Sequence, residues 1–329
     1  MPNAQCPIII MQCPKCGASV LVGDKFCEEC GTPLTASKPP TNTQGCEKCG
    51  AGIEAIDTDG YCSNCGFRRE AKKSDRIEII INSQLAGVSD RGLRHHRNED
   101  FLALHQINDS QVNILVVCDG VSSAEQPDLA ARNAAETAAG KLAHVWQSGE
   151  KPELAIKSAF AAALDSVCNI PCISGVNSDP PSTTIVAAIV YNRTVTIGWL
   201  GDSRAYWISG KASQQLTRDD SWLYEVVAAG EMSEAEARKS PQAHAITRWL
   251  GADAVADATP SIVNFTIPES GYLLLCSDGL WNYAPKAEEL AQLVARSPGK
   301  DAMSVSRSLV EFARQGGGHD NITVAVLAL

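Results

Sequence analysis

The chain has 329 residues, 44% of them hydrophobic, and a formal net charge of −10. This length and hydrophobic content exclude a disordered chain and suit one large domain with small additional modules. The acidic balance disfavours binding to a phosphate backbone, so no nucleic-acid partner is expected. Apolar stretches fall short of the roughly 20 residues that a membrane helix needs, and the first residues lack the pattern of a secretory signal. We therefore expect a cytoplasmic protein without membrane contact.

Eight of the 13 cysteines form four Cys-x-x-Cys pairs before residue 66. Two such pairs close together can present four thiolates to one ion, and segments of about 20 residues need the metal to fold. The repeated pattern predicts two structural Zn²⁺ sites in tandem zinc ribbons, residues 12–33 and 45–67, and fits free or disulfide-bonded cysteines poorly. The predicted ligands are Cys13, Cys16, Cys27 and Cys30 in the first ribbon, and Cys46, Cys49, Cys62 and Cys65 in the second.

The role of the ribbons is open between docking of a protein partner and a purely structural appendage. Four thiolates around Zn²⁺ carry net negative charge, which further disfavours a nucleic-acid role. Residues 34–44 contain a Pro-Pro pair and are predicted as a linker. Residues 68–83 are predicted as a second linker, in which the isoleucine-rich segment 77–81 is either a short strand or part of the connection. The main domain is then residues 84–329.

The main domain alternates strand-like and helix-like segments. Direct connections such as Asn192-Arg193 and Ser209-Gly210 predict antiparallel sheets with helices outside them, an α+β fold built in layers. The predicted strands are residues 114–118, 184–191, 195–200, 205–208, 262–267, 272–276 and 322–327. The predicted helices are residues 128–147, 152–167, 225–228, 286–295 and 301–314.

Several apolar strands end in, or begin just after, an acidic residue. Asp119 and Asp278 each precede a glycine, Asp202 follows a third strand, and Asp320 comes just before the last one. A single Asp-Gly pair is typical of a turn, and this alternative stays open for each pair taken alone. Carboxylates gathered at strand ends repel one another unless a cation neutralises them. The set therefore favours a metal site.

Oxygen ligands without a histidine pattern suit Mg²⁺ or Mn²⁺ better than Zn²⁺. Two such ions would carry more charge than three carboxylates and would attract a phosphate dianion. A water that bridges them would be acidified to a hydroxide able to attack phosphorus in line. A glycine after the bridging aspartate lets the backbone come close enough for its carbonyl to bind a metal.

Eight short motifs follow one another along the main domain: "SDRGLRHHRNED" (89–100), "VVCDG" (116–120), "STT" (182–184), "GDSRAYW" (201–207), "LTRDDSW" (216–222), "ITRWLGAD" (246–253), "CSDGLW" (276–281) and "HDNITV" (319–324). In these motifs and their order the main domain resembles the metal-dependent protein phosphatases, also called type 2C serine/threonine phosphatases. This resemblance implies a four-layer α/β/β/α sandwich of two antiparallel sheets, with the metal site at one end.

The resemblance also implies roles for individual residues. It implies two Mn²⁺ or Mg²⁺ ions, with a third, weaker one in some members. Residues 217–242 match the mobile flap beside the active site. The implied ligands are Asp119, which would bridge both metals, the Gly120 carbonyl, Asp278 and Asp320, Asp202 for the third metal, and Glu99 through a water, with Asp100 alongside.

The chain departs from the family pattern in two places. The family usually has an arginine that grips the substrate phosphate where this chain has His95. Arg94 or Arg97 could take that role, or His95 could donate to phosphate or supply a proton. Residues 121–122 are Val-Ser, so position 121 offers no general acid. Protonation of the leaving group would then fall to a histidine such as His95 or His96, or to a metal-bound water.

These observations predict a Mn²⁺- or Mg²⁺-dependent protein phosphatase acting on phosphoserine and phosphothreonine, with ribbons that dock partners. A pseudophosphatase that recognises phosphorylated segments without turnover is the main alternative, and the presence of Asp119, Asp278 and Asp320 argues against it. A zinc-ribbon nucleic-acid protein is the third hypothesis, disfavoured by charge. The substrate protein and the oligomeric state leave no signal in the sequence.

Overall fold

In the computed structural model, the described residues are 10–12, 16–21, 46, 49, 51–56, 61–66, 75–107, 112–172, 179–254 and 258–329. The chain divides into two compact units. Of the described residues, the larger unit holds those from Arg76 to Ile170 and from residue 179 to the end, and the smaller unit holds those from Ile10 to Asp75 with 171–172. Among the described residues there is no helix with the length and apolarity to span a membrane.

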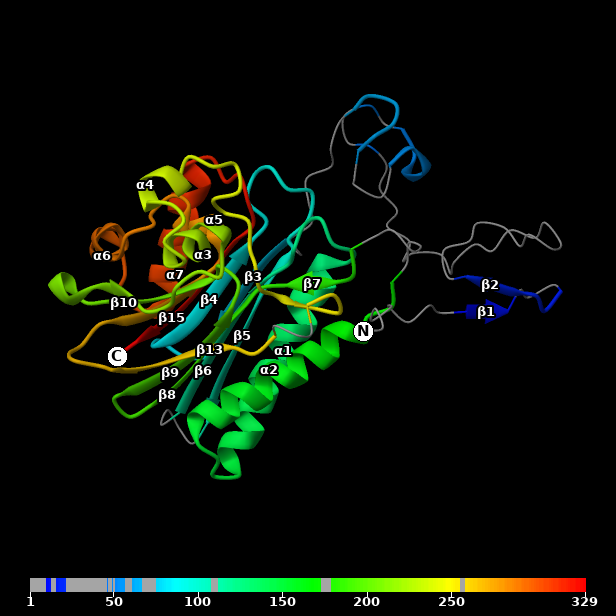
Figure 1. The fold of residues 1–329 in the computed structure, drawn as a ribbon. Helices are drawn as coiled ribbons and strands as arrows, with labels where there is room; N and C mark the ends of the chain where they lie inside the picture. Colours follow the sequence, from blue (N-terminus) through cyan, green and yellow to red (C-terminus); the bar gives the residue numbers. More distant parts are fainter. Residues whose placement is uncertain are drawn as a thin grey trace. The chain divides into compact units, whose positions relative to one another are not determined.

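Two antiparallel sheets form the centre of the larger unit (Figure 1). One is six-stranded, in the order β11-β10-β14-β15-β4-β3, and the other is five-stranded, in the order β13-β9-β8-β6-β5. Their strands are β3 (Arg76–Ile80), β4 (Leu85–Asp90), β5 (Asp100–Ile107), β6 (Val112–Asp119), β8 (Ile185–Tyr191), β9 (Thr194–Leu200), β10 (Arg204–Ile208), β11 (Gln214–Gln215), β13 (Ser261–Thr266), β14 (Tyr272–Cys276) and β15 (Ile322–Ala328). A small additional sheet pairs β7 (Ser182–Thr183) with β12 (Leu250–Gly251).

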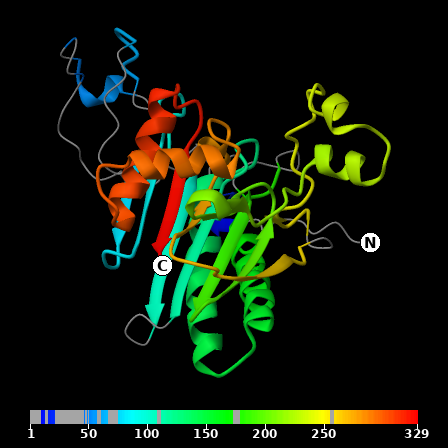
Figure 2. The same cartoon turned by 90° about the vertical axis from the view of Figure 1, so that its left-hand side faces the viewer.

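Helices cover the outer face of each sheet (Figures 1 and 2). The helices α1 (Pro127–Gln147) and α2 (Pro152–Cys168) pack on the five-stranded sheet, and α5 (Asp278–Trp281), α6 (Ala287–Arg296) and α7 (Ala302–Gln315) pack on the six-stranded one. Two short helices, α3 (Trp222–Ala228) and α4 (Glu234–Ala237), lie in the segment 217–242 and share a small apolar cluster of their own. The expected α/β/β/α sandwich is confirmed.

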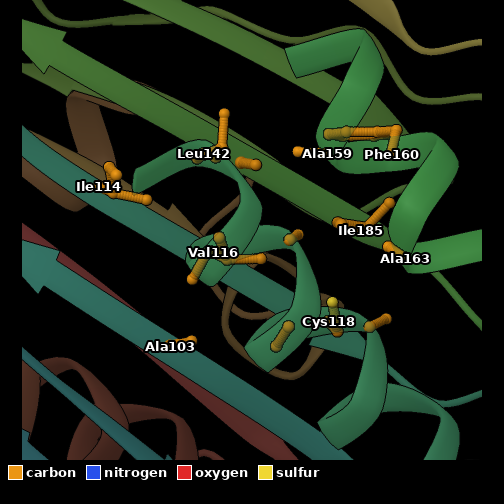
Figure 3. Packing of buried hydrophobic residues seen from close by; sticks show 14 of the residues in the cluster. Ala103, Ile114, Val116, Cys118, Leu142, Ala159, Phe160, Ala163 and Ile185 are labelled. Atoms are coloured by element: carbon orange, nitrogen blue, oxygen red, sulfur yellow. The ribbon is translucent and has the colours of Figure 1, made fainter. Parts of the chain in front are cut away.

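Strand β6 shows why the apolar run before Asp119 is needed. Its residues alternate between the helix-facing core, which contains Ile114 and Val116, and the core between the two sheets, which contains Leu115 and Val117. Figure 3 shows the first of these cores, where strand side chains meet those of α1 and α2. A strand buried on both faces needs an apolar residue at every position.

The predicted strands and helices of the main domain all occur, with ends shifted by a few residues. The sequence patterns did not predict β4 and β5, because β4 contains a glycine and two polar residues and β5 mixes polar with apolar positions. The expected linker 68–83 needs a correction. It contains β3, which pairs along its length with β4, so the folded unit begins at Arg76 rather than at residue 84.

The smaller unit is described only in part. Strands β1 (Ile10–Gln12) and β2 (Ser19–Leu21) form an antiparallel pair in the first predicted ribbon. A 3-10 turn, η1 (Ile53–Ala55), and an isolated bridge between Ile56 and Cys62 belong to the second. The expected linker 34–44 lies outside the described residues.

Candidate active site and cysteine cluster

The predicted metal-binding acids lie at one end of the sandwich, where strands of both sheets stop. Asp119 is the last residue of β6 in the five-stranded sheet, and Asp202 follows β9 of the same sheet. Asp278 begins α5 after β14, and Asp320 precedes β15, both from the six-stranded sheet. The other three acids and Asp100 all lie close enough to Asp119 to raise its pKa. The structure therefore gathers the carboxylates that the sequence spreads over 200 positions.

These carboxyl groups are buried together. Burial is the largest cause that raises the pKa of Asp119 and of Asp202 well above the usual range, and neighbouring carboxylates raise both further. Burial also raises the pKa of Asp100 and that of Asp278 to about 7. The Asp100 Oδ1 atom is buried and has no hydrogen-bond partner within the described part of the chain. Several buried carboxylates and an orphaned oxygen are the donor set that a divalent cation fits.

The two Asp-Gly pairs are not turns. Asp119 ends β6 and Gly120 forms an isolated bridge with Thr183, whereas Asp278 and Gly279 both lie in α5. Both glycines are instead close backbone contacts. A Cβ atom at Gly120 would lie 2.4 Å from the Pro127 carbonyl oxygen, and one at Gly279 would lie 1.8 Å from the Asn321 carbonyl oxygen. The absence of a side chain lets the segments that carry the acids pack against one another. The alternative that each Asp-Gly pair is simply a turn is therefore wrong.

Threonines of the "STT" motif hold the end of β6. The Thr184 backbone N–H donates to the Asp119 carbonyl oxygen at 2.8 Å, and the Thr183 hydroxyl donates to the same oxygen at 2.9 Å. The Asp119 N–H donates to the Thr184 hydroxyl at 3.3 Å. The main chain of Asp119 is therefore fixed on both sides, which leaves its carboxylate in a set position.

Ser277 links the two sheets behind the acids and is fully buried. Its hydroxyl donates to Asp100 Oδ2 at 2.7 Å and accepts from the Thr323 backbone N–H at 3.0 Å. Asp100 belongs to β5 and Thr323 to β15, so this one hydroxyl joins the five-stranded sheet to the six-stranded sheet beside the site.

Asn321 organises the loop 91–99, which carries Glu99 and the predicted phosphate-binding residues. Its Nδ2 donates to the carbonyl oxygens of Arg91 and Arg97 at 2.8 and 3.0 Å, and its Oδ1 accepts from the Glu99 N–H at 2.8 Å. The Glu99 carboxylate accepts from Arg97 Nε at 2.9 Å and from the Ser122 hydroxyl at 2.6 Å. Ser122, a departure from the family pattern, thus holds a predicted metal-site acid.

His95, where the family usually has arginine, reaches the acids. Its Nε2 lies 3.1 Å from Asp320 Oδ1, and its Nδ1 lies 3.9 Å from Glu99 Oε2. Arg97 is half exposed and also faces Asp128, with Nη1 3.4 Å from Oδ1. Arg94 is exposed and forms no ion pair with the described residues. Of the three predicted phosphate contacts, His95 faces both Asp320 and Glu99, and Arg97 faces Glu99 alone of the predicted metal ligands.

Four cysteines of the second predicted ribbon converge. The sulfur atoms of Cys46, Cys49, Cys62 and Cys65 all lie within 4.8 Å of one another. The Ala51 backbone N–H is the largest cause that lowers the pKa of Cys49, to about 6, which favours the thiolate that Zn²⁺ binds. The donor set and spacing fit a four-thiolate Zn²⁺ site. In the first ribbon only Cys16 lies among the described residues, so the site predicted from Cys13, Cys16, Cys27 and Cys30 is not described.

The family model described as protein phosphatase 2C matches residues 91–312. The chain belongs to the protein phosphatase 2C family. The serine/threonine phosphatase stp of Listeria innocua is 30% identical over 245 residues, which cover 73% of this chain and 93% of that protein. Protein phosphatase PhpP of Streptococcus pneumoniae is 28% identical and is covered to 97%. A zinc-ribbon domain model matches residues 12–34.

Solved structures agree with this family. The serine/threonine phosphatase PstP/Ppp of Mycobacterium tuberculosis has a TM-score of 0.58 and 26% identity, covering 75% of this chain and 98% of that one. MsPP of Mycobacterium smegmatis, solved in complex with cacodylate, has a TM-score of 0.56 and 27% identity, with 75% and 100% covered. The phosphatase 2C fold expected from the motifs is confirmed, and this family member is a phosphoprotein phosphatase.

Several residues that build this phosphatase 2C site were missed as functional from the sequence. Asn321, Ser277 and the threonines of "STT" lay inside quoted motifs, and that is the signal that could have marked them. Ser122 was read only as a departure, since its partner Glu99 is 23 positions away. Arg204 also lay in a motif, but its partner Asp219 sits 15 positions away in a different segment.

Proposed function

We propose that this chain hydrolyses phosphoserine and phosphothreonine in proteins with two Mn²⁺ or Mg²⁺ ions, and that a third, weaker ion binds near Asp202. The observation that carries the proposal is the cluster of buried carboxylates from both sheets. The relatives named as serine/threonine phosphatases support the substrate class, and a related PstP catalytic domain was solved in complex with 2 manganese ions.

The position of each acid in the fold suggests which part of the metal site it would form. Asp119 would bind both ions and the Gly120 carbonyl one of them, from the end of β6. Asp278 and Asp320 would bind the other ion from the six-stranded sheet. Two ions bound there would supply Lewis-acid activation of a phosphoryl group and of a water nucleophile. Glu99, held by Arg97 and Ser122, would orient a water at the rim.

The same geometry supports His95 as a contact of the substrate phosphate. Its imidazole is anchored at Nε2 by Asp320, so its ring lies at the rim of the acid cluster. A ring in that place can donate an N–H to a phosphate oxygen or pass a proton to the leaving alcohol. Arg94 and Arg97, in the same loop, supply positive charge that attracts the dianion.

The test is Mn²⁺-dependent phosphate release from a phosphothreonine peptide by the full chain. Asp119→Asn is expected to lower kcat by at least about 100-fold, beyond the loss typical of an outer-shell residue. The matched control is Asp165→Asn, an exposed carboxylate on α2, which should retain full activity. An intact chain that binds the peptide but shows no metal-dependent turnover would be a pseudophosphatase. Equal activity in Asp119→Asn would refute the site.

We further propose that the cysteine cluster binds structural Zn²⁺ and that the ribbons dock a protein partner. The convergence of the four sulfur atoms supports the metal, and the match of residues 12–34 to a zinc-ribbon domain supports a second site. Elemental analysis should find two Zn²⁺ per chain and one in Cys62→Ser, with hydrolysis of a small phosphate ester unchanged. An unchanged zinc content in the variant would contradict the assignment.

A further inference from the structure

A buried arginine beside the site has no part in the proposed chemistry. Arg204 begins β10, two residues after Asp202, and is only 7% exposed. Its Nε and Nη2 donate to the two carboxylate oxygens of Asp219 at 2.8 and 2.6 Å, and its Nη1 donates to the Tyr206 hydroxyl at 3.0 Å. Every guanidinium nitrogen is thus engaged. These hydrogen bonds offset the desolvation cost of burying the charge and fix the plane of the guanidinium.

The fixed guanidinium lies against Trp281. The Arg204 Cζ atom is 3.7 Å from the centre of the Trp281 ring. The Trp281 Nε1–H donates to the Asp202 carbonyl oxygen at 2.9 Å, and Trp281 ends the one-turn helix α5 that begins at Asp278. One tryptophan therefore contacts the segments that carry two of the predicted metal-binding acids, and Arg204 holds its ring.

Through Asp219, Arg204 also contacts the root of the flap, which is the start of residues 217–242. Asp219 lies at that root, and the neighbouring Asp220 N–H donates to the Gly201 carbonyl oxygen at 2.9 Å. Further out, a cavity of about 730 Å³ lies between flap residues such as Tyr224 and the start of α6, with Arg204 and Trp281 also in its wall. The Arg204–Asp219 pair and the Asp220–Gly201 hydrogen bond thus connect the root of the flap to the segment 201–204.

We propose that Arg204 is a positioning residue that sets the Asp202 and Asp278 side of the metal site through Trp281 and ties that side to the flap root through Asp219. Lysine cannot replace it, because an ammonium offers neither two parallel hydrogen bonds nor a flat surface for the indole. The expected effect of Arg204 on turnover rests on the proposed function. The expected effect of Arg204 on metal affinity does not rest on it.

The test measures Mn²⁺ binding by electron paramagnetic resonance of the free ion, together with kcat and KM on a phosphothreonine peptide. Arg204→Lys is expected to raise the Kd of the most weakly bound Mn²⁺ by about tenfold, the loss typical of an outer-shell residue. It should lower kcat and leave KM within about twofold, since the substrate contacts are intact.

A second variant separates the route through Trp281 from simple loss of packing. Trp281→Phe keeps an aromatic ring beside Arg204 but removes the N–H donated to Asp202, so it should reproduce the Mn²⁺ defect. The matched control is Arg307→Lys on α7, whose pair with Glu78 is exposed, and it should change neither measurement. If Arg204→Lys does not fold, Trp281→Phe still decides the question.

Two outcomes overturn the inference. In the first, both variants keep Mn²⁺ Kd values within about twofold of wild type and only their melting temperature in EDTA is lowered. That result would show that Arg204 and Trp281 have a structural role alone. The other is an intact chain that binds no Mn²⁺, which refutes the proposed function as well. An intact chain that binds Mn²⁺ without hydrolysing the peptide refutes the proposed function only, and a Kd raised in both variants still supports the positioning role.

Discussion

At the scale of single residues, the site depends on groups that hold the acids as much as on the acids. Ser277, Asn321 and Ser122 bind predicted metal-binding acids or their neighbours through short hydrogen bonds. Each satisfies a buried polar atom, and losing such a partner costs more than the bond itself contributes. The positions of the carboxylates are therefore set before any metal arrives, which reduces reorganisation on binding.

His95 gives the residue-scale prediction. His95→Ala is expected to raise KM for a phosphothreonine peptide about tenfold, because one hydrogen bond to a charged group is lost. His95→Arg should keep KM near or below the wild-type value, since a guanidinium binds phosphate with two parallel bonds. Steady-state kinetics on the three proteins, with Arg94→Ala as the comparison, measures this. If His95→Ala and His95→Arg raise KM equally, His95 does not contact the substrate phosphate.

At the scale of elements, β3 is the strand that the sequence left undecided. It forms the edge of the six-stranded sheet, and its position is fixed through Asp90 at the end of β4. The Asp90 carboxylate is 3% exposed, accepts from Arg76 on β3 at 2.9 Å, and also accepts from Arg314 on α7. One buried acid thus joins an edge strand, its neighbour and a covering helix.

Removing the partner of a buried charge is more costly than removing an exposed one. Arg314→Met is expected to lower the free energy of unfolding by about 3 kcal/mol, since Asp90 loses one of its two cations. Arg307→Met, on the same helix, breaks an exposed pair with Glu78 and should cost less than about 1 kcal/mol. Urea denaturation in EDTA gives both values. Equal losses would show that the Asp90 pair is not the anchor of β3.

At the scale of the whole molecule, the site exists because two sheets end at the same place. Asp119 and Asp202 come from one sheet, Asp278 and Asp320 from the other, and the core between the sheets fixes their separation. A sandwich is rigid, so the mutual repulsion of the acids cannot be relieved by movement. Protons or cations must relieve it.

The pH dependence of stability follows from this. In the unfolded chain these carboxyls lose their protons near pH 4, whereas in the folded protein Asp100 and Asp278 lose theirs at about 7. Between those values the folded state binds more protons, so the free energy of unfolding in EDTA should fall as pH rises, by up to about 1.4 kcal/mol per pH unit for each of the two carboxyls. Urea midpoints at pH 5, 6 and 7 measure the slope.

Mn²⁺ should reverse that slope, because the ion binds the ionised carboxylates and its affinity rises as they lose protons. Asp119→Asn is expected to flatten the EDTA slope, since it removes one buried acid whose pKa burial holds well above the usual range. A wild-type protein in EDTA that gains stability between pH 5 and 7 would contradict the burial of these groups as acids.

The sequence by itself determined which residues could do chemistry. The order of its motifs, the acids after apolar runs and the repeated Cys-x-x-Cys pairs depend on local spacing, and local spacing decides turns, strand ends and metal knuckles. From these came the class of fold, the carboxylates of the site and the cysteines of the ribbons. Residues 84–90 and 100–107 escaped the same reasoning, because their strands are stabilised by neighbours rather than by an internal pattern.

Only the tertiary structure decided how those residues meet. Asn321 reaches the Glu99 N–H across 222 positions and Ser277 reaches Asp100 across 177, and no local pattern carries such a pairing. The contact of Arg204 with Trp281, and the place of β3 in the sheet, arise in the same way from packing between distant segments. The physical reason is that spacing along the chain determines local conformation, whereas a site built between two sheets depends on the core that holds them together.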